Sequence, residues 1–306
     1  MTGQQIIRVI LNGKCANETA VRDAIFKARE RFSDYKLEVR VTWEQGDIER
    51  LYKDACNDKI TRVVVGGGDG TLNEFTHAAL SSHLETAPEL GILPLGTAND
   101  FASACGIPKS IEAALKLAIT GQAQHVDVGK CNQRYFINVA AGGFGAQITN
   151  ETPSELKNFL GGSAYTLTGL VRALNFSPYK SRFVSDSFDT KAEVIIAAIC
   201  NGRQAGGGQQ LAPNARVNDG LFDVIFISAF QISDGGQVIK ELFNPDASGT
   251  FVQRFRTKKL LCEFETHQAA PLNLDGEPLN SNRFEFEIIP KALPVVIPSN
   301  CPMLHG

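Results

Sequence analysis

The chain has 306 residues, of which 43% are hydrophobic and 21% are charged, and its formal net charge is −3. This length allows two domains with cores of ordinary size, and the composition is typical of a soluble globular protein. The nearly balanced charge argues against nucleic acid as a partner.

The cysteines and histidines indicate a reduced protein without a zinc site. Seven cysteines are scattered without a CxxC pair, and five histidines form no cluster. This usage is typical of cytoplasmic thiols. The N-terminal residues 1–13 lack the long apolar run and cleavage site of a signal peptide, so we interpret them as a first strand. No interior apolar run approaches a membrane span, so we expect a cytoplasmic protein whose membrane contact is peripheral.

Apolar runs of strand length alternate with helical stretches in the first part of the chain. Val21, Ile25, Ala28 and Phe32 recur at helical spacing, as do Ile111, Leu115 and Ile119. This alternation predicts a parallel sheet covered by helices, in which ligands bind beyond the carboxyl ends of strands. The predicted strands are Ile6–Leu11, Leu37–Val41, Val63–Val65, Leu90–Leu93 and Val126–Val128.

Beyond Gly129 the pattern changes to short alternating strands. In Phe284–Ile288, apolar and acidic residues alternate, which predicts a half-buried antiparallel strand. The domain boundary is expected near Gly129–Asn132. One helix is expected over Ala164–Leu174, and the apolar stripe of this helix is either core or the border of an acyl-chain groove. Further predicted strands are Val194–Cys200, Phe222–Ile227, Leu260–Phe264 and Leu272–Leu274.

A glycine-rich loop, GGGDGTLNE at Gly66–Glu74, follows the valine strand. It is not a Walker loop, because no GK[ST] follows, and Thr71 breaks the GxGxxG pattern. Glycines allow the backbone to approach phosphates, and a helix beginning near Thr71 would favour anions at its N-terminus. The loop therefore suits a nucleoside triphosphate.

The acid in this loop has two interpretations. Asp69 either caps the following helix or holds Mg²⁺ against the phosphates, and the spacing leaves both open. Asn73 and Glu74 lie in the first helical turn, where they could orient water or metal, although Glu there also compensates the helix dipole.

A second segment, GILPLGTANDFA at Gly91–Ala102, repeats the order of strand, tight turn and helix start. Thr97 either hydrogen-bonds phosphate or ribose or is a turn residue, and Asn99 and Asp100 are candidate caps.

Together the two segments resemble the diacylglycerol kinase catalytic-domain family, and the likeness is strongest to bacterial YegS-type lipid kinases. It extends through FINVAAGGFGAQIT, NGRQAGGGQQLAPNA, NDGLFDV and LDGEPL. The resemblance implies an α/β N-terminal domain with a parallel sheet, a C-terminal antiparallel β-sandwich domain and a cleft between them. We expect residues 1–130 to bind ATP and residues 131–306 to bind the lipid, with the C-terminal tail a candidate to pack back on the first domain.

The resemblance also implies the nucleotide contacts. Thr42 is one of them, at the end of a predicted strand, where its alternative reading is an ordinary β-branched strand residue. Many relatives begin the first loop with Asn-Pro, whereas this chain has Asn12-Gly13-Lys14, so we leave that loop unassigned. The remaining implied contacts are Gly68, Asp69, Gly70, Thr71, Leu72, Asn73, Glu74 and Thr97.

A metal site is implied at NARVNDGLFDV. Asp219 matches the liganding acid, and Arg216 and Leu221 would contribute main-chain carbonyl oxygens to Mg²⁺, with Ca²⁺ as an alternative. The other reading is a hairpin turn without an ion.

The segment LDGEPL supplies the implied base. Glu277 is the expected proton acceptor, with Asp275 as its partner or the alternative base, and Asp69 completes the catalytic acids. Without the resemblance, both residues read as solvated acids beside an Asp-Gly turn.

A basic stretch is a candidate membrane contact. Arg254, Arg256 and Lys258 alternate along a predicted strand, with Lys259 beside them, so they could share a face toward anionic lipid or simply toward solvent.

These observations predict a Mg²⁺-dependent lipid kinase that transfers the γ-phosphate of ATP to a lipid hydroxyl. The expected acceptor is phosphatidylglycerol or a related glycerolipid such as diacylglycerol. The alternatives are a soluble NAD-kinase-like enzyme and a noncatalytic nucleotide- and lipid-binding regulator. The sequence leaves the preferred lipid and the oligomeric state open.

Overall fold

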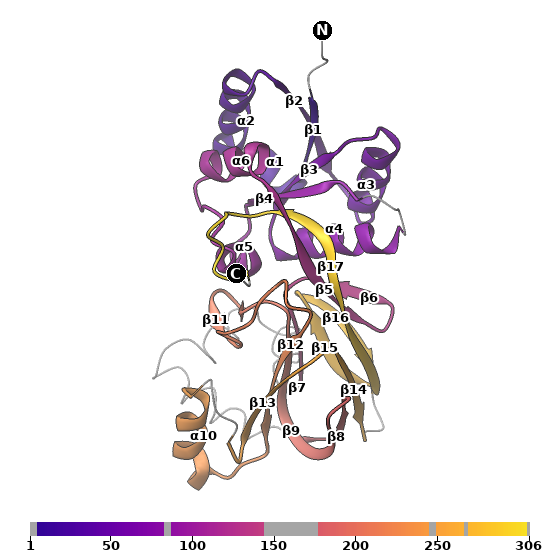
Figure 1. The fold of residues 1–306 in the computed structure, drawn as a ribbon, viewed down its shortest axis with the longest axis vertical. Helices are drawn as coiled ribbons and strands as arrows, with labels where there is room; N and C mark the ends of the chain where they lie inside the picture. The colour runs from indigo at the N-terminus through magenta and orange to yellow at the C-terminus, as the bar shows by residue number, and fades with distance from the viewer. Residues whose placement is uncertain (1–4, 83–86, 144–176, 245–248, 266–268, 305–306) are drawn as a thin grey trace. The chain divides into compact units, whose positions relative to one another are not determined.

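The computed structural model describes residues 5–82, 87–143, 177–244, 249–265 and 269–304 (Figure 1). The chain divides into two compact units. The first contains Met1–Asp127 and Pro290–Leu304, and the second contains Val128–Ile289. The chain passes between the units within two strands, β5 (Ala123–Cys131) and β17 (Arg283–Val296). The residues after Pro290 therefore belong to the first unit, which is discontinuous in sequence.

The first unit is an α/β structure in which strands and helices alternate. Four strands form parallel pairs in the order β4-β3-β1-β2. Helix α2 contacts α6, and α3 contacts α4, and the two pairs lie on opposite sides of the strands in Figure 1. The elements are β1 (Gln5–Asn12), α1 (Gly13–Ala16), α2 (Thr19–Arg31), β2 (Tyr35–Thr42), α3 (Asp47–Asn57), β3 (Arg62–Gly67), α4 (Asp69–Ser81), β4 (Glu89–Pro94), α5 (Asp100–Ala104) and α6 (Ile111–Thr120).

Burial explains why these residues form a covered parallel sheet. In β1, Ile7, Val9, Ile10 and Leu11 are all buried, although successive side chains point to opposite faces. Burial on both faces is the pattern of a parallel sheet with helices on each side. The predicted α/β domain is therefore confirmed.

One predicted strand has different partners from those expected. We assigned Val126–Val128 to the parallel sheet, but β5 pairs instead with β6 (Arg134–Phe136) and with β17. The strand itself was recognisable because Val126 and Val128 are buried. Its partner could not be recognised, because β17 begins more than 150 residues later and no local pattern connects the two.

The second unit is the antiparallel β-sandwich that the sequence predicts. Strands lie in the order β16-β15-β7-β9-β8-β14-β17, and β12 pairs with β9 and β13. Its remaining elements are β7 (Val139–Gly143), β8 (Tyr179–Val184), β9 (Asp189–Cys200), β10 (Gln204–Ala205), β11 (Gln209–Gln210), β12 (Phe222–Ser228), η1 (Ile232–Asp234), α10 (Gly235–Leu242), β13 (Val252–Thr257), β14 (Lys259–Phe264), β15 (Ala270–Leu274) and β16 (Glu277–Ser281).

Phenylalanine rings form much of the core of this unit. Phe183 stacks on Phe226 with a centroid distance of 4.9 Å, and Phe136 stacks on Phe222 at 5.8 Å. These four rings come from β6, β8 and β12, and all are buried. The predicted helix over Ala164–Leu174 lies outside the described residues, so its apolar stripe has no structural interpretation here.

Candidate active site

Four strands of the first unit deliver their carboxyl ends to one edge of the sheet. The register pairs Asn12, at the end of β1, with Thr42, at the end of β2. It also pairs Gly67 with Pro94, the last residues of β3 and β4. Because these strands are parallel, the loops that follow them lie on the same edge, where ligands of open α/β sheets bind. The structure thus brings together Thr42 and the two predicted loops.

Hydrogen bonds connect these loops to the end of β1. The Asn12 side-chain amide donates to Thr71 Oγ1 at 3.2 Å, and the Gly13 backbone N–H donates to Thr42 Oγ1 at 3.3 Å. Asn12 also caps α1, since its Oδ1 accepts from the Lys14 backbone N–H at 3.0 Å. The sequence interpretation left Asn12 unassigned. Its signal was an N-cap residue placed directly after a buried strand.

The two glycine loops approach each other backbone to backbone. A Cβ added at Gly96 would lie 2.4 Å from the Gly68 Cα, closer than such contacts allow. Asn99 supports this turn: its Oδ1 accepts from the Gly96 N–H at 2.9 Å, and its Nδ2 donates to the Gly96 carbonyl at 2.7 Å. Asn99 has a φ of 50°, a conformation that Asn adopts more readily than most residues. It is therefore a turn brace rather than a side-chain cap of α5.

The first turn of α4 carries the acid that the sequence left ambiguous. The N-cap position belongs to Gly68 and has no side-chain cap bond, so Asp69 is the first helical residue rather than the cap. The capping interpretation is therefore wrong. A carboxylate here does oppose the positive end of the helix dipole. The position also allows a role toward a metal-bound phosphate.

The other predicted nucleotide residues differ in exposure. Thr71, Leu72 and Asn73 are buried, whereas Glu74 and Thr97 are exposed. The Leu72 side chain belongs to the core, so only its backbone could meet a ligand. Its N–H is already bonded to the Gly68 carbonyl at 3.1 Å.

In the second unit, the predicted Asp-Gly turn joins β15 to β16. Asp275 and Gly276 have φ values of 50° and 104°, and Leu274 pairs with Glu277 across the turn. Positive φ at both central residues is the signature of a tight two-residue hairpin. The turn interpretation and the functional interpretation of LDGEPL are thus compatible, because the turn fixes where both acids lie.

Asp275 is a hydrogen-bond acceptor for a distant segment of backbone. Its carboxylate accepts from the N–H groups of Ile137 at 2.7 Å, Asn138 at 3.1 Å and Val139 at 2.7 Å. The Asp275 N–H returns a bond to the Val139 carbonyl at 3.0 Å. These contacts commit both carboxylate oxygens to holding the start of β7 against the hairpin.

Glu277 has a different environment two residues later. It begins β16 and is half-buried, and within the described part of the chain its carboxylate makes neither a hydrogen bond nor an ion pair. Its oxygens are therefore accessible to a proton donor in a way that those of Asp275 are not.

The predicted metal ligands lie in the loop that precedes β12. Asp219 Oδ1 accepts from the Leu221 N–H at 3.1 Å, and Arg256 forms an ion pair with Asp219 Oδ2. Nowhere in the described ranges do three or more His, Cys, Asp or Glu side chains cluster as metal ligands. A divalent ion here would therefore depend on carbonyl oxygens and water besides Asp219, as Mg²⁺ and Ca²⁺ sites often do. Asp219 and the carbonyl groups of its loop are hard oxygen donors of the kind that a divalent ion takes, and the guanidinium on Asp219 shows that the carboxylate accepts a positively charged partner.

The two carboxylates beside this loop lie close to one positively charged side chain. Asp223 lies 3.3 Å from the Arg256 Nε. Burial raises the pKa of Asp223, the Arg256 charge opposes that shift, and Asp219 adds to it. Two partly buried carboxylates thus share one guanidinium.

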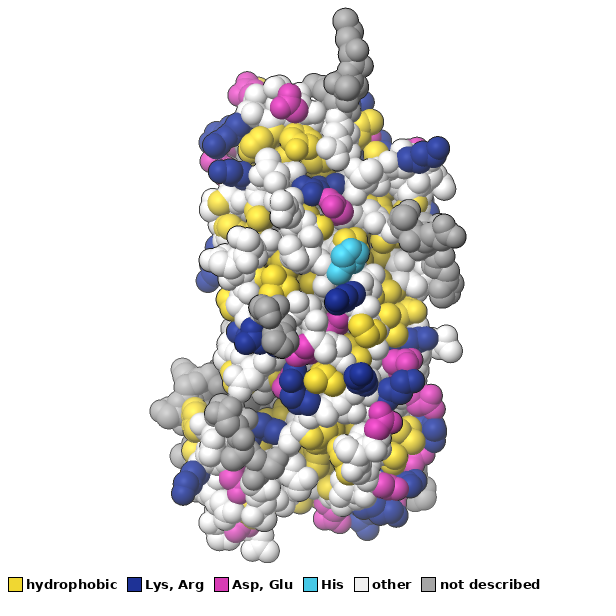
Figure 2. Space-filling model, in the orientation of Figure 1, with side chains coloured by type: hydrophobic (Ala, Val, Ile, Leu, Met, Phe, Trp, Pro, Cys, Tyr) yellow, Lys and Arg dark blue, Asp and Glu magenta, His cyan; other side chains and the backbone are white. Residues whose placement is uncertain are grey.

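Two of the four basic residues on the candidate membrane face of β13 bind partners within the second unit. Arg254 donates to the carbonyls of Glu241, Leu242 and Asn244 at the end of α10, and Arg256 is bound to acids. Figure 2 shows blue and magenta side chains interspersed on the face in view. Lys258 is exposed and Lys259 pairs with Glu287, so these contacts leave the choice between anionic lipid and solvent open.

The sites separate by unit: all predicted nucleotide residues lie in the first, whereas Asp219, Asp275 and Glu277 lie in the second. Comparison with known proteins connects both units to one activity. Residues 7–131 match the diacylglycerol kinase catalytic domain, and residues 138–297 match the YegS C-terminal NAD kinase β-sandwich-like domain.

Similar proteins cover nearly the whole chain. A protein from Shewanella frigidimarina named probable lipid kinase YegS-like is 45% identical, over 97% of this chain and 96% of its own. The probable lipid kinase YegS of Salmonella gallinarum is 41% identical, over 97% of both. The crystal structure of a diacylglycerol kinase from Bacillus anthracis aligns with a TM-score of 0.75 at 23% identity, covering 97% of this chain and 98% of that one, and supports the fold.

The fold and these matches define a lipid kinase with a diacylglycerol kinase-type catalytic domain. Within that class, the chain belongs to the YegS-like family of lipid kinases. In the part of the chain that the structure describes, no helix combines the length and apolar character needed to cross a membrane.

Proposed function

We propose that this lipid kinase transfers the γ-phosphate of ATP to a free hydroxyl of a glycerolipid, with phosphatidylglycerol the first acceptor to test and diacylglycerol the related one. The relatives named as lipid kinases support this acceptor class over NAD. They also favour a catalyst over a noncatalytic regulator.

The observation that carries the ATP proposal is the meeting of loops at the carboxyl ends of β1–β4. The close approach of Gly68 and Gly96 leaves the loop backbone without side-chain cover, and α4 begins there with its N-terminal N–H groups. Such a backbone suits phosphates, which accept hydrogen bonds and favour the positive end of a helix dipole. Thr42, Gly68–Glu74 and Thr97 would make the nucleotide contacts.

The second unit would supply the base. As the lipid oxygen bonds to the γ-phosphorus, the bond from that phosphorus to ADP breaks, and the hydroxyl proton passes to the Glu277 carboxylate. Such general-base assistance contributes about 10²–10⁴ in rate. Asp275 would position the hairpin that carries Glu277, because its own oxygens accept three backbone N–H groups.

A divalent cation, Mg²⁺ or alternatively Ca²⁺, would bind at Asp219 with the carbonyl oxygens of Arg216 and Leu221. When bound, it supplies positive charge close to the acids of this loop. Asp69 would hold the Mg²⁺ that accompanies the nucleotide, which would explain why a phosphate-binding loop contains an acid. We further propose a cytoplasmic enzyme that contacts the membrane peripherally to reach its acceptor.

The test is transfer of labelled γ-phosphate from ATP to lipids in mixed micelles, with Mg²⁺ or with EDTA. Phosphatidylglycerol, diacylglycerol and NAD would be the acceptors, and the variants would be Asp69→Asn and Glu277→Gln. Asp23→Asn and Glu285→Gln are matched controls, because both remove an exposed carboxylate from the same units without touching the proposed site.

We expect labelled lipid from the wild type and both controls, with losses of about 10²–10⁴-fold for Glu277→Gln and with EDTA abolishing transfer. Labelled NAD without labelled lipid would show that the acceptor is soluble NAD rather than a lipid. ATP binding without transfer to any acceptor would favour the regulator.

A further inference from the structure

A cluster of two acids and one arginine forms where the loop before β12 meets β13. Asp223 and Arg256 are direct partners in the β12–β13 register. The Arg256 Nε lies 3.3 Å from Asp223 Oδ2, and its Nη2 pairs with Asp219 Oδ2. The side chain of Asp219 is 8% exposed and that of Arg256 is 44% exposed. One partly exposed cation thus neutralises two mostly buried anions.

The oxygen that Arg256 contacts is the one that a metal would need. Asp219 Oδ1 is occupied by the Leu221 N–H, which leaves Oδ2 as the outward acceptor. A divalent ion bound there would stand within a few ångströms of the guanidinium charge, and like charges at that separation repel strongly where water is partly excluded. Cation and guanidinium therefore exclude each other.

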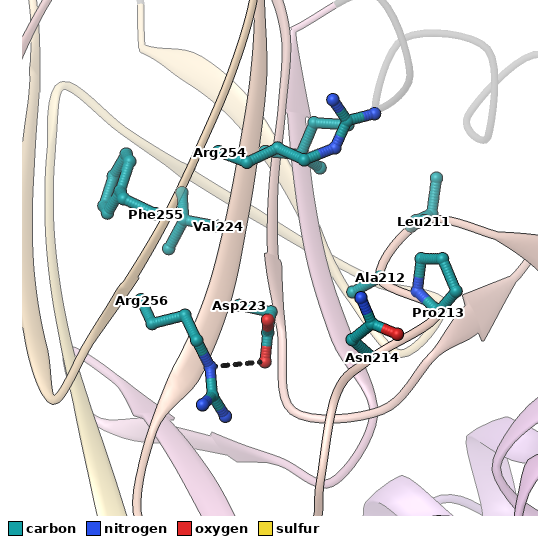
Figure 3. A pocket seen from close by; sticks show the side chains of 10 residues that line it. Leu211, Ala212, Pro213, Asn214, Asp223, Val224, Arg254, Phe255 and Arg256 are labelled. Atoms are coloured by element: carbon teal, nitrogen blue, oxygen red, sulfur yellow. Dashed lines mark hydrogen bonds and ion pairs between the residues drawn. The ribbon is translucent and has the colours of Figure 1, made fainter. Parts of the chain in front are cut away.

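A cavity lies next to the Arg256 side chain. A pocket of about 220 Å³ is lined by Leu211–Asn214, Asp223–Ile225 and Arg254–Phe255, and Arg256 forms part of its wall. In Figure 3 the Arg256 side chain turns toward Asp223, and the side chain of Arg254 points away from both. The pocket therefore leaves space beside the Arg256 side chain.

We propose that Arg256 is a built-in competitor for the divalent cation at Asp219: it neutralises Asp219 and Asp223 when the metal is absent and must leave Asp219 for the metal to bind. This inference rests on the metal site of the proposed function and adds the residue that sets its affinity. The metal-free loop is stabilised by the guanidinium, and metal binding releases a positive side chain beside the pocket.

The test measures metal binding by the full chain without ATP or lipid, using Mn²⁺ followed by electron paramagnetic resonance and Mg²⁺ followed by calorimetry. The variants are Arg256→Gln, which removes the competing charge, and Arg256→Lys, which keeps the charge but loses the fork that reaches both acids. Lys258→Gln is the matched control, because it removes an exposed positive charge two residues away.

We expect Arg256→Gln to bind the ion on the order of tenfold more tightly than the wild type, since one competing unit charge is removed. Arg256→Lys should fall between them, and Lys258→Gln should match the wild type. Without metal, Arg256→Gln should unfold at a lower temperature, because two neighbouring acids lose their partner, and added Mg²⁺ should raise that temperature more than in the wild type.

Unchanged or weaker binding by Arg256→Gln would overturn the competition. If Asp219→Asn in the Arg256→Gln background left binding intact, the ion would lie elsewhere, and both the competition and the Asp219 metal site would be wrong. Transfer of phosphate to lipid is measured in a separate assay, so these binding results would not decide the proposed kinase activity.

Discussion

Gly68 and Gly96 lie so close that a methyl group on Gly96 would approach the Gly68 Cα to 2.4 Å. One glycine precedes α4 and the other follows β4, and both belong to loops at the carboxyl end of the parallel strands. Glycine is needed at Gly96 because of this backbone contact. The two segments that first indicated a phosphate-binding protein are therefore one structural feature.

Substitution Gly96→Ala should separate the two loops. We expect a loss of about 1–3 kcal/mol in the free energy of unfolding, the usual cost of an inserted methyl in a packed site. ATP affinity should fall as well, measured by calorimetry on folded protein. Gly235→Ala is the control, because nothing lies within 4 Å of its added Cβ, and it should lower neither quantity, since alanine is the better helix former in α10. If Gly96→Ala binds ATP with normal affinity, the contact between Gly96 and Gly68 is not needed for nucleotide binding.

The bond between Asn12 and Thr71 should couple the two residues energetically. Asn12→Ala, Thr71→Val and the double variant form a cycle, and we expect a coupling of about 1 kcal/mol in stability, the net value of one hydrogen bond. Asn12→Ala should cost about another 1 kcal/mol because it also removes the cap of α1. Urea unfolding measures both. Thr19→Val, at the exposed start of α2, controls for the substitution itself, and strictly additive effects would show that the bond contributes nothing.

Asp275→Asn should lower the stability of the fold more than it lowers the rate of phosphate transfer by the folded protein. Asparagine tolerates the positive φ of this turn, so the change removes the charge and one acceptor while the backbone can remain. With three N–H groups facing the carboxylate, we expect a loss of about 2–3 kcal/mol. Thermal unfolding and transfer corrected for the folded fraction would measure both effects.

Glu277→Gln provides the comparison for that variant, because it should unfold like the wild type and lose transfer. A stable but inactive Asp275→Asn would instead identify Asp275 as the base.

Glu241 should contribute to stability in a pH-dependent way. Burial would raise the pKa of this carboxyl, but bonds from the Val252 N–H, the Gln237 amide and the N–H groups of Phe251 and Thr250 outweigh it and lower the pKa to about 2, from an ordinary 4.5. Because the folded value is depressed, the contribution is complete above the ordinary value and is lost as the pH falls from 4.5 toward 2.

Glu241→Gln should therefore be less stable than the wild type at pH 7, by about 1 kcal/mol after solvent screening. The difference should shrink as the pH falls below 4.5. Urea unfolding at several pH values measures it, with Glu193→Gln as an exposed control on β9. A difference that stays constant down to pH 2.5 would contradict ionisation as its source.

The sequence by itself determined the local elements of this protein. Periodicity predicted β1–β4 and their helices, because burial on both faces leaves continuous apolar runs and covering helices repeat at helical spacing. The Asp-Gly pair at Asp275–Gly276 was readable because these residues tolerate the positive φ of a tight turn. The glycines at Gly66–Gly68 were readable because glycine lets the backbone approach a ligand closely.

Only the tertiary structure decided which of these elements meet. Asp275 binds backbone that is more than 130 residues away, Asn12 reaches Thr71, and β13 brings Arg256 to Asp219. Local patterns record whether a side chain is buried, but not which strand lies beside it, because register and pairing depend on packing of the whole chain. That is why the partners of the β13 arginines, including the pairing of Arg256 with the proposed metal ligand, could be found only in the folded protein.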